Sequence, residues 1–438
     1  MNAANPAYTL PYLLGDAWGL MLSFIFLYPV MMACLWVLGA LVFYFRDERK
    51  PHRIVDRPPL RDEYPLIAVL VPCFNEEANA RETIEALMAL HYPNFEVIAI
   101  NDGSRDRTGE ILDALADEFP RLRVIHNLKN QGKAVGLNTA ALLTHAEILV
   151  GIDGDARLDP NCLHWLVRHF DAPGVGAVTG NPRVRTRSTL LGRLQVGEFS
   201  SIVGLIKRAQ RAIGLIFTVS GVIAAFRRSA LFEAGFWSPD KLTEDVDITW
   251  KLQLAGWEVR FEPRALCWIL MPETLRGLWR QRLRWATGGA QVIFDYWTEI
   301  WHRPRLWPVF VEYSLSIFWA FCMSVLIVYR LLDRLIFPSV DLQSVPVLML
   351  GWTGILIGLV CMLQMLFSLW LDRPYDRGLL KNYFWMIWYP IVYWLLTAAT
   401  AVAALPAVLL RTSGKRATWI SPDRGLGTQT PPAPKQDR

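Results

Sequence analysis

The stretch Leu66-Ile-Ala-Val-Leu-Val-Pro72 decides the fold class of this chain. It is a continuous apolar run that ends in turn-forming residues, which is typical of a strand buried on both faces of a parallel sheet. We expect further strands at 97–100, 124–125 and 148–152, with helices between them at 77–90, 108–118 and 133–143. Strands that alternate with helices of this length predict right-handed βαβ units and an open α/β sheet.

The alternation loosens after Pro160 but continues to residue 274. The expected elements are a helix at 161–170, a strand at 175–179, a long helix at about 190–213, a strand and turn at 219–222, and a helix at 248–254. Thr243 is a candidate N-cap for the last of these helices. Residues 63–274 are therefore predicted to form one α/β domain.

Four apolar runs flank this domain, and each is long enough to cross a bilayer: about 17–45, 306–329, 345–371 and 382–410. A hydrophobic content of 53%, a mean hydropathy of +0.24 and 19 tryptophans fit a membrane protein better than a soluble enzyme. Clusters of basic residues follow the first and third runs: Arg46, Arg49, Lys50, Arg53, Arg373, Arg377 and Lys381. By the positive-inside rule, the α/β domain and the linker to residue 62 are cytoplasmic.

The last apolar run leaves two topologies open. It contains Pro390 and Pro406, so it is either a hairpin broken near these prolines or a single crossing. A single crossing would leave the basic tail at 413–438 outside, against the positive-inside rule. The tail is rich in Pro, Gly and Gln from about residue 422 and is predicted to be disordered.

The composition excludes several classes of protein. A net charge of +5 is mild for 438 residues and gives no nucleic-acid signal. The six cysteines are scattered without a CxxC pair, which argues against a disulfide framework or zinc site and fits a reduced, cytoplasmic catalytic region. The seven histidines likewise show no metal-ligand spacing.

Polar residues follow three of the predicted strands: Asn75-Glu76-Glu77, Asp102 and Asp153-Gly154-Asp155. Ligands bind open α/β sheets beyond the carboxyl ends of the strands, so we expect these residues to share one rim. The Asp-Gly-Asp triplet can hold Mg²⁺ or Mn²⁺ beside phosphate oxygens, or it is simply a turn. Asp102 can accept a hydrogen bond from a base imide or a ribose hydroxyl, or it starts an Asx-turn. Asn75 and Glu76 can equally signal a helix N-terminus.

Two charged positions at helix starts complete the candidate chemistry. Lys133 begins a helix, where a positive charge opposes the dipole unless a phosphate is nearby. Glu244 and Asp245 precede another helix, where they either satisfy the N-terminus or supply a general base. Glu273 and Asp240 are nearby acids in weaker contexts.

The segment 275–303 is predicted to be an amphipathic helix containing Gln281-Arg-Leu-Arg-Trp285. Positions i, i+3 and i+4 share a helix face, so Gln281, Arg284 and Trp285 should point one way. An amide, a guanidinium and an aromatic plane suit a diphosphate and a sugar ring. The alternative is a helix that only lies on the membrane, with Arg snorkelling and Trp at the interface.

These motifs occur in an order that resembles the processive family 2 glycosyltransferases of GT-A fold, which include cellulose, chitin and hyaluronan synthases. Within this family the chain is most similar to the bacterial synthases that make poly-β-1,6-N-acetyl-D-glucosamine for the biofilm matrix. The stretches that carry the resemblance are Gly180-Asn-Pro-Arg-Val-Arg-Thr-Arg-Ser188, Val219-Ser-Gly-Val-Ile-Ala-Ala-Phe-Arg-Arg228, Thr243-Glu-Asp245, Cys267-Trp-Ile-Leu-Met-Pro-Glu-Thr274, Gln281 to Trp285 and Trp419-Ile-Ser-Pro-Asp-Arg424. The resemblance implies a GT-A domain inserted between transmembrane helices.

The resemblance also implies roles for individual residues. Asp102 and Asp153 would bind the uridine part of the donor, with Asn75, Glu76 and Lys133 nearby, and Asp155 would hold Mg²⁺ or Mn²⁺ on the diphosphate. Asp245 would be the general base, next to Glu244. Gln281, Arg284 and Trp285 would bind the diphosphate and the acceptor sugars, and Arg282 is included although its helical direction differs.

The implied activity is inverting, processive transfer from UDP-GlcNAc to a nascent polysaccharide in the bacterial inner membrane. The implied partners are lipid, a small membrane subunit or a second copy, and regulation by cyclic di-GMP through the complex. The alternatives are a β-1,4-polysaccharide synthase and a transferase of single sugars to a lipid phosphate. A transporter or receptor with an inert nucleotide-binding domain is disfavoured, because Glu312 is the one charged residue in the core of the spans.

Overall fold

The centre of the molecule is an eight-stranded mixed sheet with strand order β3-β2-β1-β4-β7-β6-β8-β5. The computed structural model describes residues 6–49, 56–336, 352–386 and 389–410. The strands are β1 Ile67–Cys73, β2 Phe95–Asp102, β3 Leu122–Asn127, β4 Ile148–Ile152, β5 Arg157–Leu158, β6 Val175–Val184, β7 Ile223–Arg227 and β8 Glu258–Ile269. The first four strands of this order are parallel, as the sequence predicts. Strand β7 then pairs antiparallel with both β4 and β6.

Strand β1 has a neighbour on each side, β2 and β4, and all seven of its residues are buried. Its side chains alternate between two cores, because successive residues of a strand point to opposite faces. Val69 and Val71 pack in one core, whereas Ala68 and Leu70 pack in the other. This arrangement explains why the deciding stretch is apolar throughout rather than alternating.

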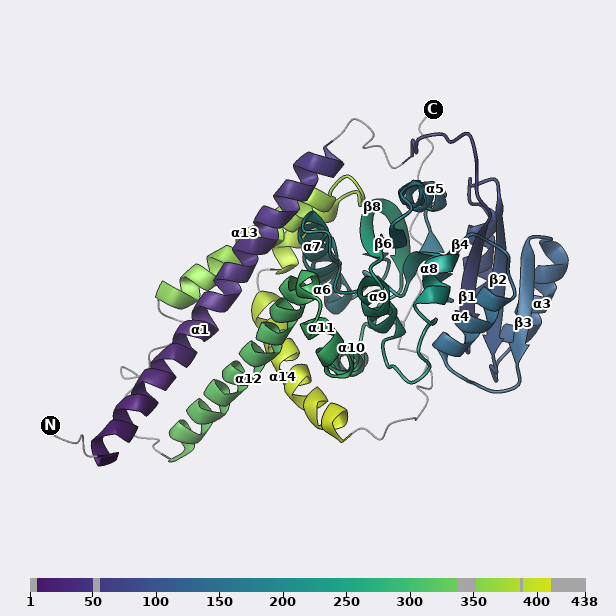
Figure 1. The fold of residues 1–438 in the computed structure, drawn as a ribbon. Helices are drawn as coiled ribbons and strands as arrows, with labels where there is room; N and C mark the ends of the chain where they lie inside the picture. Colours follow the sequence, from purple (N-terminus) through teal and green to yellow (C-terminus); the bar gives the residue numbers. More distant parts are fainter. Residues whose placement is uncertain (1–5, 50–55, 337–351, 387–388, 411–438) are drawn as a thin grey trace.

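Helices cover both faces of the sheet (Figure 1). One core receives side chains from α2, α3 and α5, and the other receives them from α4, α8 and α9. These helices are α2 Ala80–Met88, α3 Thr108–Glu118, α4 Lys133–Leu142, α5 Cys162–Val167 with the 3-10 helix η2 Arg168–Asp171, α8 Arg228–Glu233 and α9 Glu244–Leu254. The predicted alternation of strands and helices is therefore present from β1 to β4.

Several expected elements of the second half differ from the prediction. The strand expected at 219–222 lies at 223–227, after a turn, and the helix expected at 248–254 begins at Glu244. The strand expected at 175–179 continues to Val184, so that the basic run begins inside the sheet. The helix expected at 190–213 is divided into α6 Leu190–Glu198, the π-helix η3 Phe199–Ile206 and α7 Lys207–Ala212. Close packing accompanies the wider turn, because a Cβ atom on Gly204 would lie 2.6 Å from a carboxylate oxygen of Asp372. Such contacts are set by distant segments and leave no local signal.

Among the described residues, four helices are long and apolar enough to cross a membrane, with candidate spans at 16–48, 304–333, 354–372 and 392–409. They correspond to α1 Pro6–Phe43 with the π-helix η1 Tyr44–Glu48, α12 Trp307–Ile336, α13 Trp352–Asp372 and α14 Tyr389–Leu409. Figure 1 shows α1 and α12 side by side, extending away from the sheet, and the two helices contact each other.

The last predicted span was wrong in its extent. Residues Leu379–Met386 form a separate 3-10 helix, η6, that contacts α6 and α13, and α14 begins only at Tyr389. Pro390 therefore lies at the start of α14, where a proline is tolerated, while Pro406 lies inside the helix. The tail at 413–438 and the start of the run predicted at 345–371 lie outside the described residues.

Between the sheet and the spans lies α10 Leu275–Asp295, followed by α11 Trp297–Trp301 and the 3-10 helix η4 Pro304–Leu306. Thr274 caps α10, because its hydroxyl accepts a hydrogen bond from the Gly277 N–H at 3.1 Å. Helix α10 contacts both α9 of the domain and α14. The domain boundaries proposed from the sequence stay predictions.

Candidate active site

The carboxyl ends of β1, β2 and β4 form one rim, and the acidic residues expected there lie on it. Glu76 follows β1, Asp102 ends β2 and Asp153 follows β4. A Cβ atom on Gly154 would lie 3.2 Å from the Glu76 side chain, so the turns after β1 and β4 are in contact. The strand order therefore brings together three acidic segments that are far apart in the sequence.

Asn75 and Glu76 do not cap a helix, contrary to one of the two sequence interpretations. Helix α2 begins later, at Ala80, with Asn79 at the N-cap position. Asn75 instead adopts the left-handed conformation (φ 54°), which asparagine tolerates better than most residues. Its side-chain oxygen accepts a hydrogen bond from the Arg105 N–H at 2.9 Å, and the Ser104 hydroxyl accepts one from the Asn75 N–H. These two hydrogen bonds of Asn75 join the turns after β1 and β2.

The Asp102 carboxylate organises the loop that leads into α4. It is buried and accepts hydrogen bonds from the backbone N–H groups of Gln131 and Gly132 at 2.8 to 3.1 Å, and from the Asn127 amide at 2.9 Å. Gly132 has φ 94°, a conformation that favours glycine. Asp102 therefore fixes the position at which Lys133 starts α4.

Lys133 joins three parts of the site. Its ammonium group lies 2.5 Å from Asp153, 3.2 Å from Glu244 and 2.9 Å from the Gly221 carbonyl oxygen. Burial acts to lower the pKa of Lys133, but the charges of Asp153 and Glu244 outweigh it and raise the pKa. Two carboxylates already compensate the charge of Lys133, and a phosphate beside it stays a prediction.

Asp155 is the buried member of the Asp-Gly-Asp triplet, with 7% of its surface exposed. Burial and the charge of Asp153 raise the pKa of Asp155 to about 7. Two neighbouring carboxylates of this kind are hard oxygen ligands whose mutual repulsion a divalent cation relieves. No group of three or more Asp, Glu, His or Cys side chains suited to a metal occurs among the described residues. The residues fit a cation whose remaining ligands come from a bound diphosphate.

Glu244 and Asp245 form the first turn of α9. The Gly221 N–H donates to one Asp245 carboxylate oxygen at 3.0 Å, and the Val246 N–H donates to the other at 2.9 Å. Burial and the neighbouring Glu244 raise the pKa of Asp245. For Glu244 the effect of burial is outweighed by Lys133 and then Arg284, which lower its pKa. Thr243 occupies the predicted N-cap position of α9, but its side chain makes no capping hydrogen bond.

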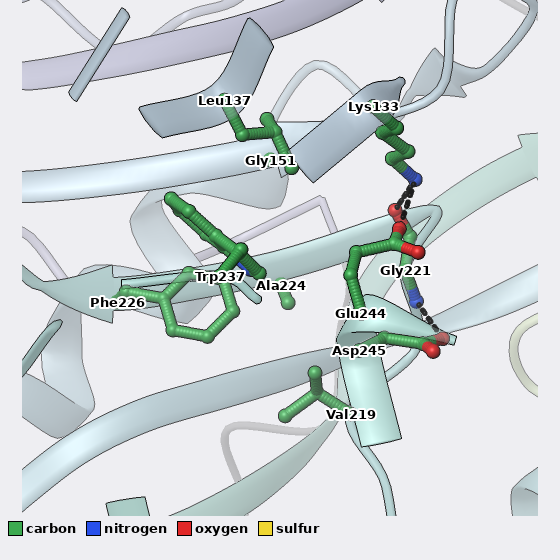
Figure 2. A pocket seen from close by; sticks show the side chains of 10 residues that line it. All are labelled: Lys133, Leu137, Gly151, Val219, Gly221, Ala224, Phe226, Trp237, Glu244 and Asp245. Carbon is green, nitrogen blue, oxygen red and sulfur yellow. Dashed lines mark hydrogen bonds and ion pairs between the residues drawn. The ribbon is translucent and has the colours of Figure 1, made fainter. Parts of the chain in front are cut away.

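A pocket opens beside this acidic pair (Figure 2). Lys133, Glu244 and Asp245 lie on one side, while Phe226 and Trp237 form an apolar wall on the other. Leu137, Gly151, Val219, Gly221 and Ala224 complete the lining. The arrangement offers a cation that can bind a charged leaving group and a carboxylate with a raised pKa that can accept a proton, while Phe226 and Trp237 belong to the buried core behind them.

The side chains of the Gln281–Trp285 stretch point in two different directions. Arg284 points toward α9 and donates to the Leu242 carbonyl at 3.3 Å; its charge helps to lower the pKa of Glu244 and partly opposes the rise in the pKa of Asp245. Arg282 is buried, pairs with Glu198 at 2.6 Å and stacks 4.2 Å from the Trp285 ring centre. The expectation that Trp285 shares the direction of Arg284 was therefore wrong.

Gln281 also belongs to the Arg282 side of the helix. Its amide oxygen accepts a hydrogen bond from Arg282 at 2.9 Å, and its nitrogen contacts the Met271 sulfur at 3.9 Å. The i, i+3, i+4 rule gives only Cβ directions, and long side chains bend toward the partners available to them. The ion pair with Glu198, 84 residues earlier in the chain, decides the direction here.

Sequence reasoning missed Gly221 and the apolar wall of Phe226 and Trp237. Gly221 had a usable signal, because Val219-Ser220-Gly221 is a turn beside a predicted strand. A Cβ atom on Gly221 would lie 3.0 Å from an Asp245 oxygen, so glycine permits the close approach. Phe226 and Trp237 resemble ordinary core residues in the sequence, and no local pattern distinguishes them.

Known proteins of similar structure and sequence are glycosyltransferases. A mannosyltransferase from Pyrobaculum calidifontis, solved in complex with GDP-Man and Mn²⁺, superposes with a TM-score of 0.59 over 87% of this chain and 98% of its own, at 20% identity. The likeness establishes the GT-A fold, so the predicted fold class is confirmed. The sequence profile described as "Glycosyltransferase like family 2" matches residues 65–288.

Two curated relatives extend the match beyond the catalytic domain. The poly-beta-1,6-N-acetyl-D-glucosamine synthases of Staphylococcus epidermidis and Staphylococcus aureus strain COL are each 34% identical, over 406 and 409 residues. The alignments cover 92% of this chain and 98% of the relatives. The chain belongs to glycosyltransferase family 2, and it is a membrane-embedded glycosyltransferase.

Proposed function

We propose that this protein polymerises UDP-N-acetylglucosamine into poly-β-1,6-N-acetyl-D-glucosamine and passes the polymer across the membrane. The observation that carries the proposal is the pocket in which Glu244 and Asp245 lie beside Lys133 at the rim of the parallel strands, with the charge of Arg284 acting on both acids from outside the lining. The names of the staphylococcal relatives support the choice of sugar and linkage.

The donor would lie along the rim of β1, β2 and β4. Asn75, Glu76, Asp102 and Asp153 are proposed to bind its uridine part, with Lys133 beside the diphosphate. Asp155 is proposed to hold a divalent cation, Mg²⁺ or Mn²⁺, and the archaeal mannosyltransferase, which was solved with Mn²⁺, is in keeping with this. When bound, such a cation supplies positive charge that offsets the charge of the diphosphate.

Asp245 would act as the general base. It takes the proton from the 6-hydroxyl of the chain-end sugar, and that oxygen attacks C1 of the donor as the bond from C1 to the diphosphate oxygen breaks. One displacement inverts the α-linked donor into a β-linked product. Arg284, whose charge reaches both acids, would stabilise the departing UDP, a type of electrostatic effect that is often the largest in catalysis.

Gln281, Arg282, Trp285 and Glu244 are proposed to define the acceptor side of the site. Arg282 is buried against Glu198, so its contribution would be to hold the Gln281 amide and the Trp285 ring in place. Gln281, Arg282 and Trp285 lie on α10, which contacts both α9 of the catalytic domain and α14, whereas Glu244 begins α9. The polymer would therefore leave the pocket toward the spans.

The catalytic domain is proposed to face the cytoplasm of a bacterium, with the spans in its inner membrane. Four spans are few to enclose a polysaccharide, so a small membrane subunit or a second copy would complete the passage. Cyclic di-GMP would act through that complex. Purification of a lone chain with full polymerising activity would argue against the need for a partner.

The test of this function is the product. Membranes containing the protein, incubated with UDP-GlcNAc and Mg²⁺ or Mn²⁺, should yield a long polymer that a β-1,6-specific hydrolase degrades. EDTA should stop synthesis, and adding the cation back should restore it for the wild type but only weakly for Asp155→Asn. A product resistant to that hydrolase, or a single sugar on a lipid phosphate, would instead support one of the two enzymatic alternatives.

A further inference from the structure

Lys207, at the start of α7, is a buried cation outside the set of residues assigned above. Only 5% of its surface is exposed, and its ammonium group contacts the hydroxyls of Ser220 at 2.6 Å and Thr179 at 3.3 Å. In the described part of the chain, no ion pair joins it to a carboxylate. Buried lysines are normally paired, so an unpaired one needs an explanation.

Burial lowers the pKa of Lys207 to about 7, and Asp245 is the charged group that opposes this shift. A methionine would fill the same space without the desolvation cost of an ammonium group. Packing alone therefore does not account for a lysine at this position. The field of Asp245 and the two hydroxyl contacts do account for it.

Ser220 connects Lys207 to the candidate base. Its N–H donates to the Thr179 hydroxyl at 2.8 Å, and its own hydroxyl accepts from Lys207. The next residue, Gly221, donates its N–H to Asp245 at 3.0 Å and accepts from Lys133 through its carbonyl at 2.9 Å. Figure 2 shows these last two contacts on the pocket side of the segment. The segment Ser220–Gly221 therefore contacts Lys207 and Thr179 through Ser220, and Asp245 and Lys133 through Gly221.

We propose that Lys207 is a positioning residue for the catalytic base, acting through Ser220 to aim the Gly221 N–H at the Asp245 carboxylate. The inference rests on the proposed role of Asp245. The bond from Gly221 fixes one carboxylate oxygen, so the lone pair that receives the acceptor proton has a defined direction. Loss of Lys207 should let the segment drift and should slow the chemical step, while the donor side of the pocket keeps its contacts.

The experiment compares Lys207→Met, Ser220→Ala and the double variant in the full chain, in membranes. We expect Lys207→Met to lower kcat about ten- to a hundredfold, the effect of losing one charged hydrogen bond at a preorganised site. The affinity for UDP should stay within about twofold, well under 1 kcal/mol. The double variant should be no slower than Lys207→Met, because both changes break the same link.

Lys251→Met is the matched control, since Lys251 also donates to a serine hydroxyl, that of Ser238, and to the carbonyls of Gly235 and Phe236, but near the far end of α9. It should lower thermal stability without a comparable loss of kcat. If Lys207→Met does not accumulate in membranes, Ser220→Ala and Thr179→Val provide the same comparison. The inference is overturned if kcat is unchanged, if UDP affinity falls in parallel with kcat, or if the two effects multiply in the double variant.

Asp245→Asn, measured alongside, separates this inference from the function on which it rests. If Asp245→Asn keeps normal turnover, the base assignment fails and the role of Lys207 fails with it. If Asp245→Asn is inactive while Lys207→Met turns over normally, the base assignment stands and only the positioning role is lost.

Discussion

Glu244 and Asp245 are neighbours in one helical turn, yet their surroundings separate their pKa values. Both are buried, which by itself raises the pKa of a carboxyl group. The ion pair with Lys133 at 3.2 Å reverses the effect for Glu244, while Asp245 keeps a raised pKa. Two acids whose environments push their pKa values apart are typical of a site that assigns them different tasks. Asp245 is the one suited to accept a proton.

Asp245→Asn is therefore expected to abolish polymer synthesis while preserving UDP binding. An amide keeps the shape of the carboxyl group and can still accept the Gly221 hydrogen bond, but it cannot take a proton from a hydroxyl. Loss of general base catalysis corresponds to a fall in kcat of about 10²- to 10⁴-fold. Sugar incorporation from labelled UDP-GlcNAc measures the rate, and calorimetry with UDP measures binding. Normal turnover would remove Asp245 from the mechanism.

The pH dependence follows from the same pair. The ionised form of Asp245 is the active base, so kcat/KM should rise with pH through a pKa above the ordinary aspartate range. Glu244 raises that pKa, so Glu244→Gln should move the acid limb to lower pH, whatever it does to the maximal rate. Rate profiles of the two proteins from pH 4 to 8 make the comparison. A limb that moves to higher pH would contradict the coupling.

At this scale the sequence predicts some residues and not others. Asp102, Asp153, Glu244 and Asp245 could be found because each lies at the end of a strand or the start of a helix, where local pattern and ligand geometry coincide. The direction of Trp285 could not, because it depends on an ion pair between α10 and α6. Side-chain direction is decided by partners that the local sequence does not contain.

At the scale of the elements, a buried network of ion pairs joins the catalytic domain to two of the spans. Arg208 on α7 binds Glu48 at the end of η1 at 2.8 Å and Asp372 at the end of α13 at 2.8 Å. Arg183 on β6 binds the same Asp372 at 2.7 Å. All four side chains are at most 2% exposed. The network joins two spans to the sheet at one point.

Arg208→Met should destabilise the protein strongly, because it removes the guanidinium that both Glu48 and Asp372 bind in a buried site. Breaking a buried ion pair in this way costs about 3–5 kcal/mol. Thermal unfolding in a mild detergent measures the loss. The matched control is Arg81→Met, which removes an exposed i,i+4 pair with Glu85 and should leave the unfolding temperature unchanged. Equal stability of the two variants would mean that the network is not a structural anchor.

No pattern in the sequence predicts this network of ion pairs. Glu48 and Asp372 are separated from Arg208 by 160 and 164 residues, and in the sequence each resembles an ordinary charge near the end of an apolar run. The division of the helix at 190–213 could not be predicted for a similar reason, because η3 packs against α13, which is distant in the sequence. Spans and strands could be predicted from composition and period, but the contacts between them could not.

For the whole molecule, the network also determines which ends of the spans lie beside the catalytic domain. The ends of η1 and α13 are bound to Arg208, so both lie on the domain side. Helix α12 starts next to α11 and runs 30 residues to Ile336, far enough to place its end on the opposite side. With Arg46, Arg49, Arg373 and Arg377 on the domain side, the positive-inside rule supports the proposal that the domain faces the cytoplasm.

Cysteine labelling in intact cells should therefore distinguish two sides. Ile336→Cys should react with a membrane-impermeant maleimide added outside, because this exposed residue ends α12 away from the domain. Arg377→Cys, after α13, should react only once the membrane is opened. Leu128→Cys, on a fully exposed loop of the catalytic domain, is the matched reporter and should behave like Arg377→Cys. If positions 336 and 377 were labelled alike, α13 would not run from the far side back to the domain. That result would contradict the proposal that the donor reaches the pocket from the cytoplasm while the polymer leaves along the spans.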